Sequence, residues 1–307
     1  MTIKNAESFF AWDVLSWLIM AMALAIIIVV VDLLLSKKKN QIDAVSYKKK
    51  SKIGSFFYFL VFLKFSKSEK YRHRPKVVQW SIELFPVLFL VLVFRGFIFE
   101  PFRVPSNSMM PTLLTGDFII VNKFDYGLRL PITNTKIMEL SSPNRGDVIV
   151  FRKPGDESID YIKRLIGIPG DMVQIKKGIL HINGKSANRV KTNVGMMKNI
   201  YGIEKVFTQY KENFEDTNIH QIIESSDTDP FDDTIEFKVP DDHFFFMGDN
   251  RDNSRDSRTS EVGFVPKRNL IGKAQIIFFS HNNSASFYEF WKWHKSIRFS
   301  RIGKAIE

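Results

Sequence analysis

Two long apolar runs stand in the first third of the chain. The first, Val14 to Val31, has Ser16 as its one polar residue among 18 positions. A helix of that length, at about 1.5 Å per residue, nearly spans a bilayer core of about 30 Å. The second runs from Val77 to Phe99 and contains a long unbroken apolar stretch. We predict transmembrane helices over 14–35 and 77–99.

The excess positive charge of the chain lies between these two runs. The sequence has 44 Lys and Arg against 33 Asp and Glu, a formal charge of +11, and Lys37 to Lys76 holds 13 basic and two acidic residues, 13 − 2 = +11. Cytoplasmic loops of membrane proteins carry such an excess. Basic residues placed after the first run favour a membrane anchor over a cleaved signal peptide. We predict a cytoplasmic loop at 36–76, with 1–13 and 100–307 on the extracytoplasmic side.

Confinement of the charge to one loop also bears on the binding partners. A face that binds nucleic acid normally recruits basic residues from a folded domain. Outside 37–76, however, the charges of this chain cancel. We predict the lipid bilayer as a partner and no nucleic acid.

Beyond the second run the pattern changes to short strands. Apolar and β-branched runs bounded by Gly, Pro and Asp are typical of strands, and Lys177 with Gly178 indicates a turn. We predict a mainly β fold, in which two N-terminal transmembrane helices precede an extracytoplasmic all-β domain of curved sheets. The more polar residues from about 185 to 242 predict an inserted smaller β subdomain, interpreted as a solvated appendage. The predicted strands begin at Phe118, Asp147, Asp160, Met172, His243 and Lys273.

Cysteine is absent from the sequence, and the six histidines are scattered without metal-ligand spacing. The first fact excludes disulfides, thiolate catalysis and thiolate-bound metal. The second disfavours a zinc site or a triad based on His. We predict no metal and no cofactor.

A candidate nucleophile follows the second apolar run. Ser106 and Ser108 stand between Pro105 and Pro111, and the prolines keep this turn out of regular helix or strand. A serine on such a turn can present its hydroxyl to a bound peptide, provided that a base activates it. The candidates are carboxylates, or a lysine whose pKa is lowered by apolar surroundings, such as Lys163 in the run YIKRLIGIPGD. Either residue alone is more often an ordinary loop or strand residue.

A third segment, MGDNRDNSRDSR from Met247 to Arg258, is dense in Gly, Asn, Asp and Ser. This composition predicts a tight loop rich in hydrogen bonds. Asp256 and Arg258 could form a pair that supports a site, and Ser254 could accept a hydrogen bond from a lysine amine. A solvated turn is the alternative interpretation.

Together the three segments resemble the signature boxes of bacterial type I signal peptidase, also called leader peptidase. The boxes are PSxSMxPTL, RGDVIVF followed by DYIKR and GxPGD, and GDNRDNSxDSR; they occur in order from about Phe99 to Leu270, with an RFSRIGK ending. The resemblance implies a multi-pass serine endopeptidase of the bacterial inner (cytoplasmic) membrane. It would cleave signal peptides from exported preproteins after small residues of an Ala-x-Ala site, in contact with the secretion translocon. Two departures are Asn107, where the family often has Gly, and TSEVGF, where it has an aromatic residue.

The resemblance also implies roles for single residues. Ser108 would be the nucleophile and Lys163 the general base, made neutral by burial near Tyr161 and Ile162. The Ser106 hydroxyl and the Ser108 N–H would form the oxyanion hole. Ser254 would orient the lysine, supported by Asp256 and Arg258. The residues that would line the substrate pockets are Phe102, Val104, Pro105, Met109, Leu113, Ile119, Val150, Tyr161 and Ile162.

Two other functions are consistent with parts of the pattern. A membrane-tethered β domain could bind extracytoplasmic proteins without catalysis, with Ser108 and Lys163 merely structural. A soluble serine–lysine autoprotease of the transcriptional-repressor type would share the dyad and the sheet. The second is disfavoured because two apolar runs, and no helix-turn-helix pattern, precede the serine. Turnover of a peptide with an Ala-x-Ala site discriminates catalysis from binding.

Overall fold

The computed structural model of the chain divides into two compact units, one ending at Ile98 and the other beginning at Phe99. The predicted N-terminus 1–13 and most of the predicted loop 36–76 lie outside the described residues. The structure describes residues 14–39, 75–129, 136–138, 140–198, 204–214, 219–226, 229–282 and 290–306.

The first unit contains two long helices, α1 (Val14–Lys39) and α3 (Lys76–Val93), and α3 continues into a π-helical turn, η2 (Phe94–Ile98). Among the described helices, one stretch, Lys76–Gly96, is long and apolar enough to cross a membrane, with a mean hydropathy of 2.2. The apolar stretch found within α1, Trp17–Asp32, is shorter. Length and composition therefore favour the second predicted span, and the first stays a prediction.

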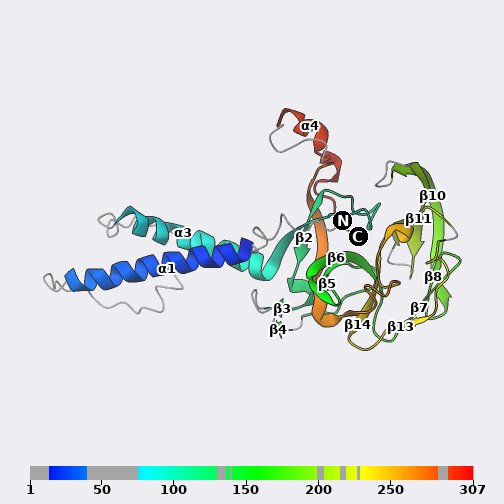
Figure 1. The fold of residues 1–307 in the computed structure, drawn as a ribbon, viewed down its shortest axis with the longest axis horizontal. Coiled ribbons are helices and arrows are strands. Elements are labelled where there is room, and N and C mark those ends of the chain that lie inside the picture. The colour runs from blue at the N-terminus through cyan, green and yellow to red at the C-terminus, as the bar shows by residue number, and fades with distance from the viewer. Residues whose placement is uncertain are drawn as a thin grey trace. The chain divides into compact units, whose positions relative to one another are not determined.

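A seven-stranded antiparallel sheet forms the centre of the second unit, in the order β1-β2-β16-β5-β6-β14-β15 (Figure 1). Five of the six strand starts predicted from the sequence belong to this sheet, which confirms the mainly β character of the domain. The strands are β1 (Phe99–Arg103), β2 (Asp117–Asn122), β5 (Val148–Lys153), β6 (Asp156–Gly167), β14 (His243–Met247), β15 (Val265–Pro266) and β16 (Leu270–Ser280).

Three smaller sheets complete this unit. Lys177 and Gly178 have φ values of 49° and 72°, as the predicted turn between β7 and β8 requires. Residues 185–242 belong to the same compact unit as the main sheet. The predicted separate subdomain therefore stays a prediction. The sheets are β3 (Leu128–Arg129) with β4 (Lys136–Met138); β13 (Phe237–Lys238), β7 (Met172–Lys176), β8 (Ile179–Ile182) and β9 (Lys185–Ser186); and β10 (Asn188–Lys198), β11 (Glu204–Asn213) and β12 (Ile219–Glu224).

Short helical turns join these strands and form the C-terminal segment. They are η3 (Phe124–Tyr126), η4 (Arg251–Asn253), η5 (Lys267–Asn269), η6 (Phe290–Lys292), α4 (Trp293–Ser296) and η7 (Phe299–Arg301).

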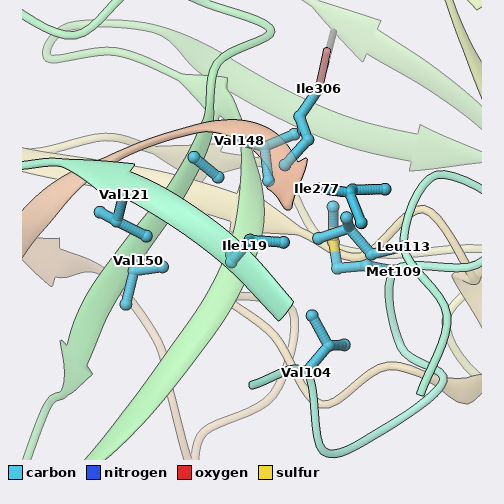
Figure 2. Close-up of a cluster of buried hydrophobic side chains, with 10 residues drawn as sticks. Val104, Met109, Leu113, Ile119, Val121, Val148, Val150, Ile277 and Ile306 are labelled. Atoms are coloured by element: carbon cyan, nitrogen blue, oxygen red, sulfur yellow. The ribbon is translucent and has the colours of Figure 1, made fainter. Parts of the chain in front are cut away.

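Apolar clusters cover both faces of the main sheet. Side chains alternate between the faces along a strand, so β5 contributes Val148 and Val150 to one cluster and Ile149 and Phe151 to another. The first cluster lies under the β1–β2 connection, and Figure 2 shows Met109 and Leu113 of that connection among its members. In the second, the Phe151 ring stacks on Phe246 with the centroids 4.5 Å apart. The first cluster comprises Val104, Met109, Leu113, Ile119, Val121, Val148, Val150, Ala274, Ile277 and Ile306.

Candidate active site

The turn that carries Ser108 is held by its own backbone and by the core beneath it. Val104 donates its N–H to Asp117 O at 2.8 Å, and Gly116 donates to Val104 O at 3.0 Å, so the turn is closed at its base. Met109, next to the serine, is fully buried. Ser108 is itself 8% exposed. Packing of its neighbour therefore holds the backbone at Ser108 in place.

Lys163 reaches this hydroxyl from the middle of β6. Its Nζ lies 2.6 Å from Ser108 Oγ and 3.0 Å from Ile162 O, and 5.4 Å from the centroid of the Tyr161 ring. Tyr161 and Lys163 share one face of β6 because they are two residues apart. Ile162 packs on the opposite face with the first cluster. The predicted apolar surroundings of the amine are therefore supplied by Tyr161, while Ile162 contributes its carbonyl oxygen.

Burial changes the protonation of this amine. Lys163 is 5% exposed, and removal of the ammonium from water lowers its pKa from 10.5 to about 8. The negative charges of Asp256 and Asp249 oppose this shift, and the positive charge of Arg258 adds to it. A substantial fraction of the amine is therefore neutral near pH 8, the state that can accept a proton from serine.

Ser106 lies at the edge of the same pair. Its Oγ is 3.3 Å from Ser108 Oγ, and its side chain is exposed. A hydroxyl in this place is close enough to the reacting oxygen to contact a substrate carbonyl. Its predicted role in an oxyanion hole is compatible with this position and stays a prediction.

The segment after β14, residues 248–258, docks on the serine turn and is called the catalytic loop below. Asn250 donates its backbone N–H to Ser108 O at 3.1 Å and its side-chain amide to Asn107 O at 3.0 Å. A Cβ on Gly248 would lie 2.5 Å from Ser108 O and would also collide with Ser254. Gly248 is therefore required for the close approach of the loop to the serine.

Asp256 and Arg258 form the ion pair that the sequence predicted. Arg258 Nε and Nη2 each donate to the carboxylate at 2.9 Å, and Gly248 N–H donates to Asp256 at 3.0 Å. Burial by itself would raise the pKa of Asp256, but the charge of Arg258 and these hydrogen bonds outweigh it and lower the pKa. The pair thus holds Gly248, and with it the start of the catalytic loop.

Ser254 is buried in the catalytic loop, with its side chain against Gly248. In the part of the chain that the structure describes, no hydrogen bond joins its hydroxyl to Lys163. Its predicted role in orienting the lysine therefore stays a prediction.

Sequence reasoning missed a second buried ion pair, between Arg164 and Asp249. Arg164 Nε and Nη2 donate to the two carboxylate oxygens at 2.8 Å each, and Nη1 donates to Gly146 O at 2.7 Å. Thr112 Oγ1 donates to Asp249 at 2.5 Å. The charge of Arg164 outweighs the effect of burial and lowers the pKa of Asp249. This pair joins the serine turn, β6 and the catalytic loop. The detectable signal was an arginine placed directly before the apolar, buried end of β6, Leu165–Gly167.

The C-terminal segment holds the serine turn from its other side. Asp117, at the start of β2, is fully buried. Arg301 Nη2 donates to it at 2.6 Å and to Thr112 O at 2.8 Å. Arg298 Nη2 donates to Thr115 O at 2.8 Å. The RFSRIGK ending, quoted only as part of the resemblance, therefore has a structural role at the site.

The predicted pocket residues divide according to exposure. Met109, Leu113 and Ile119 are 0–1% exposed and lie inside the first cluster. Tyr161 packs against the second cluster, and Pro105 is exposed. Contact with a substrate stays a prediction for all nine residues. The seven that belong to or pack against the first cluster are Phe102, Val104, Met109, Leu113, Ile119, Val150 and Ile162.

A serine hydroxyl beside a buried amine, carried on an antiparallel β domain, is the arrangement of a serine-type hydrolase. Residues 77–279 match the family model of signal peptidase, peptidase S26. The chain belongs to this family and is an enzyme, a serine-type peptidase. The alternative of a non-catalytic binding domain is thereby set aside.

Individual relatives agree with this assignment. Signal peptidase I of Pseudomonas fluorescens is 42% identical over 221 residues, which cover 69% of this chain and 76% of the relative. Signal peptidase I of Buchnera aphidicola subsp. Acyrthosiphon pisum is 36% identical over 272 residues, covering 77% and 84%. A crystal structure of a signal peptidase I from Enterococcus faecalis is 26% identical and covers 44% of this chain and 98% of its own, with a TM-score of 0.26 that carries no argument about the fold.

Proposed function

We propose that this enzyme removes N-terminal signal peptides from exported preproteins, with Ser108 as the nucleophile and neutral Lys163 as the general base. The observation that supports this most is the 2.6 Å separation of Lys163 Nζ and Ser108 Oγ. The lowered pKa of the amine supports the same assignment. The names of the relatives supply the substrate class.

The reaction is an acyl transfer in two halves. Lys163 Nζ accepts the proton of Ser108 as Oγ bonds to the scissile carbonyl carbon, and the carbonyl oxygen becomes an oxyanion. The Ser108 N–H and the Ser106 hydroxyl stabilise that oxyanion. When the C–N bond breaks, the Lys163 ammonium gives its proton to the departing amine of the mature protein. Water then attacks the ester, Lys163 accepts the water's proton and returns it to Ser108 Oγ, and the signal peptide leaves as an acid.

Small residues before the cut, as in an Ala-x-Ala site, follow from a shallow apolar binding surface. Phe102 and Ile162 are partly exposed where they pack against the first cluster. The side chains beneath them are fully buried and tightly packed, so extra methylene groups on a substrate would force strain of about 1–3 kcal/mol. Selectivity at the first and third positions before the cut is therefore assigned to this surface.

Membrane attachment is proposed through residues 14–35 and 77–99. The 26 residues of α1 extend over about 39 Å at about 1.5 Å per residue. Apolar side chains such as Leu24, Ile27 and Leu84 are exposed on the two helices, where lipid would cover them. With the basic loop 36–76 in the cytoplasm, residues 100–307 lie outside the bacterial inner membrane, where preproteins and the secretion translocon are within reach.

Cleavage of a preprotein by the full-length enzyme in lipid vesicles tests this proposal. We expect Ser108→Ala and Lys163→Ala each to abolish cleavage while the protein remains folded and inserted. Ser260→Ala, which removes an exposed serine hydroxyl two residues after the catalytic loop, is the matched control and should retain full activity. Normal cleavage by Ser108→Ala would refute the assignment of the nucleophile.

A further inference from the structure

The three-stranded sheet β10-β11-β12 has one face buried at its end near the catalytic loop. Glu212 of β11 is 0% exposed and His220, its register partner on β12, is 5% exposed. A solvated appendage, the interpretation made from the sequence, would not bury charged groups in this way, because desolvation of an unpaired charge costs several kcal/mol. The buried end of this sheet therefore has a partner.

We propose that the sheet β10-β11-β12 buttresses the catalytic loop and that Glu212 is a positioning residue for the peptidase reaction. This inference rests on the proposed roles of Ser108 and Lys163. It assigns a function to the segment between β9 and β14, none of whose residues takes part in the proposed chemical steps.

The first support is an ion pair across the junction. Both carboxylate oxygens of Glu212 accept from the guanidinium of Arg251, at 3.0 Å for Nη1 and in closer contact with Nη2. The carbonyl oxygen of Arg251 accepts from Arg258 Nη2 at 2.6 Å, and Arg258 is the partner of Asp256. Because Asp256 holds Gly248, the ion pair is linked through four residues to the point where the loop meets Ser108.

The second support is backbone pairing between β12 and the catalytic loop. Ile223 donates its N–H to Asp249 O at 2.9 Å and forms a parallel β-bridge with Asn250. Asn250 in turn donates to Ser108 O. Ser225 N–H donates to the carboxylate of Asp252 at 2.6 Å. The loop is thus bordered by β12 along residues 249–252.

The third support is the anchoring of the sheet on the side of β7 and β8, which lie beside β10 and β11 in Figure 1. Arg189 of β10 pairs with Glu224 of β12 and donates to Gly178 O at 2.9 Å, in the β7–β8 turn. Its guanidinium carbon lies 3.6 Å from the centroid of the Tyr210 ring. A sheet fixed at this second place can hold the catalytic loop against displacement.

The ion pair persists over the pH range of an assay. Burial would raise the pKa of Glu212, but Arg251 and then His220 outweigh it and lower the pKa to about 2. The carboxylate is therefore charged at any pH at which Lys163 can act as a base.

Steady-state kinetics of full-length Glu212→Gln in lipid vesicles test the proposal. Loss of the charge frees Arg251, and a displacement of about 1 Å in the loop is expected to lower kcat by about 100-fold. The substrate surface is formed elsewhere, so KM should change by less than about twofold. Lys211→Gln, one position away on the exposed face of β11, is the control and should behave as the parent. Asp252→Ala removes the acceptor for Ser225 but keeps the Glu212–Arg251 pair, so a smaller displacement of the loop should lower kcat by about tenfold.

Thermal unfolding of each variant shows whether it is folded at the assay temperature, and Asp252→Ala serves as the test if Glu212→Gln is not. A folded Glu212→Gln or Asp252→Ala enzyme with unchanged kcat would overturn the proposal, as would a loss confined to KM. If Ser108→Ala abolishes cleavage in the same assay, an unchanged kcat in these variants refutes only the proposed role of the sheet β10-β11-β12 and leaves the proposed function standing. Retained cleavage by Ser108→Ala would instead refute the proposed function.

Discussion

The two faces of β6 carry two adjacent buried basic side chains, Lys163 and Arg164, which have different partners. Lys163 faces Tyr161 and the serine hydroxyl, and no carboxylate forms a salt bridge with it among the described residues. Arg164, one residue later, meets both oxygens of Asp249 and a backbone carbonyl. Both side chains are at most 5% exposed. The two faces of β6 therefore hold one buried amine whose pKa is lowered and one buried guanidinium that a carboxylate binds.

The difference comes from the partner and from the chemistry of the side chain. A lysine amine that loses water without gaining a carboxylate at hydrogen-bonding distance becomes easier to deprotonate, whereas a guanidinium stays charged in proteins. Arg164 with Asp249 fixes three chain segments in place, and Lys163 is left for the proposed acid–base chemistry. Four substitutions or measurements test this division of roles.

The largest effect on activity is expected when position 163 carries an arginine, as position 164 does. Lys163→Arg keeps the positive charge but supplies no neutral base, so kcat/KM should fall by at least about 1000-fold at every pH. The measurement is preprotein cleavage between pH 7 and 10. Recovery of activity at high pH in this variant would show that position 163 is not the base.

Removal of the arginine tests the structural half of the comparison. Arg164→Met leaves Asp249 buried without its cation and should lower the free energy of unfolding by about 3–5 kcal/mol. Chemical unfolding in detergent measures this change. The double variant Arg164→Met/Asp249→Leu removes both charges and should regain most of the loss. Equal destabilisation of the single and double variants would contradict this account.

Removal of Lys163 should raise the free energy of unfolding, whereas removal of Arg164 should lower it. The pKa of Lys163 is lowered from 10.5 to about 8, and each pKa unit corresponds to about 1.4 kcal/mol, so burial of the ammonium costs about 3 kcal/mol below pH 8. Between pH 8 and 10.5 the unfolded chain binds this proton and the folded chain does not, so stability of the parent rises with pH. We expect inactive Lys163→Met to be more stable by up to about 3 kcal/mol at pH 6 and to lose most of that advantage by pH 10. An equal difference at both pH values would be inconsistent with a lowered lysine pKa.

The pH profile of the parent enzyme gives the smallest and most direct signal. Because the neutral amine is the proposed active form, kcat/KM should rise about tenfold per pH unit below pH 8 and level off above it. The profile is measured with a preprotein whose own groups do not titrate in this range. A flat profile between pH 6 and 9 would remove the lysine as the titrating base.

The segment 185–242 and the catalytic loop are a second pair of regions, similar in composition but different in their burial. Both the segment 185–242 and the catalytic loop are rich in Asp, Asn and Ser. Composition favours a solvated appendage for the first and allows a solvated turn for the second. In the structure Glu212 and Arg251 are buried together. Composition could not indicate this, because the two residues are 39 positions apart and each has several oppositely charged residues nearby in the sequence.

The sequence by itself determined five of the seven strands of the main sheet, the candidate chemistry and the family resemblance. Strand starts at Phe118 and His243 are found within one residue of β2 and β14, because a period of two and β-branched residues act locally. Ser108, Lys163 and the pair Asp256–Arg258 could be proposed from ordered motifs, since each motif is a short continuous segment.

Only the tertiary structure decided which charges meet. Asp249 contacts Arg164 across 85 positions, and Asp117 contacts Arg301 across 184. The pKa of Lys163 likewise depends on the water that its surroundings exclude and on charges from the catalytic loop. Burial and ion pairing depend on distances in space, which a linear pattern does not contain. The sequence therefore identified Ser108 and Lys163 as candidates, whereas the lowered pKa of Lys163 depends on the tertiary structure.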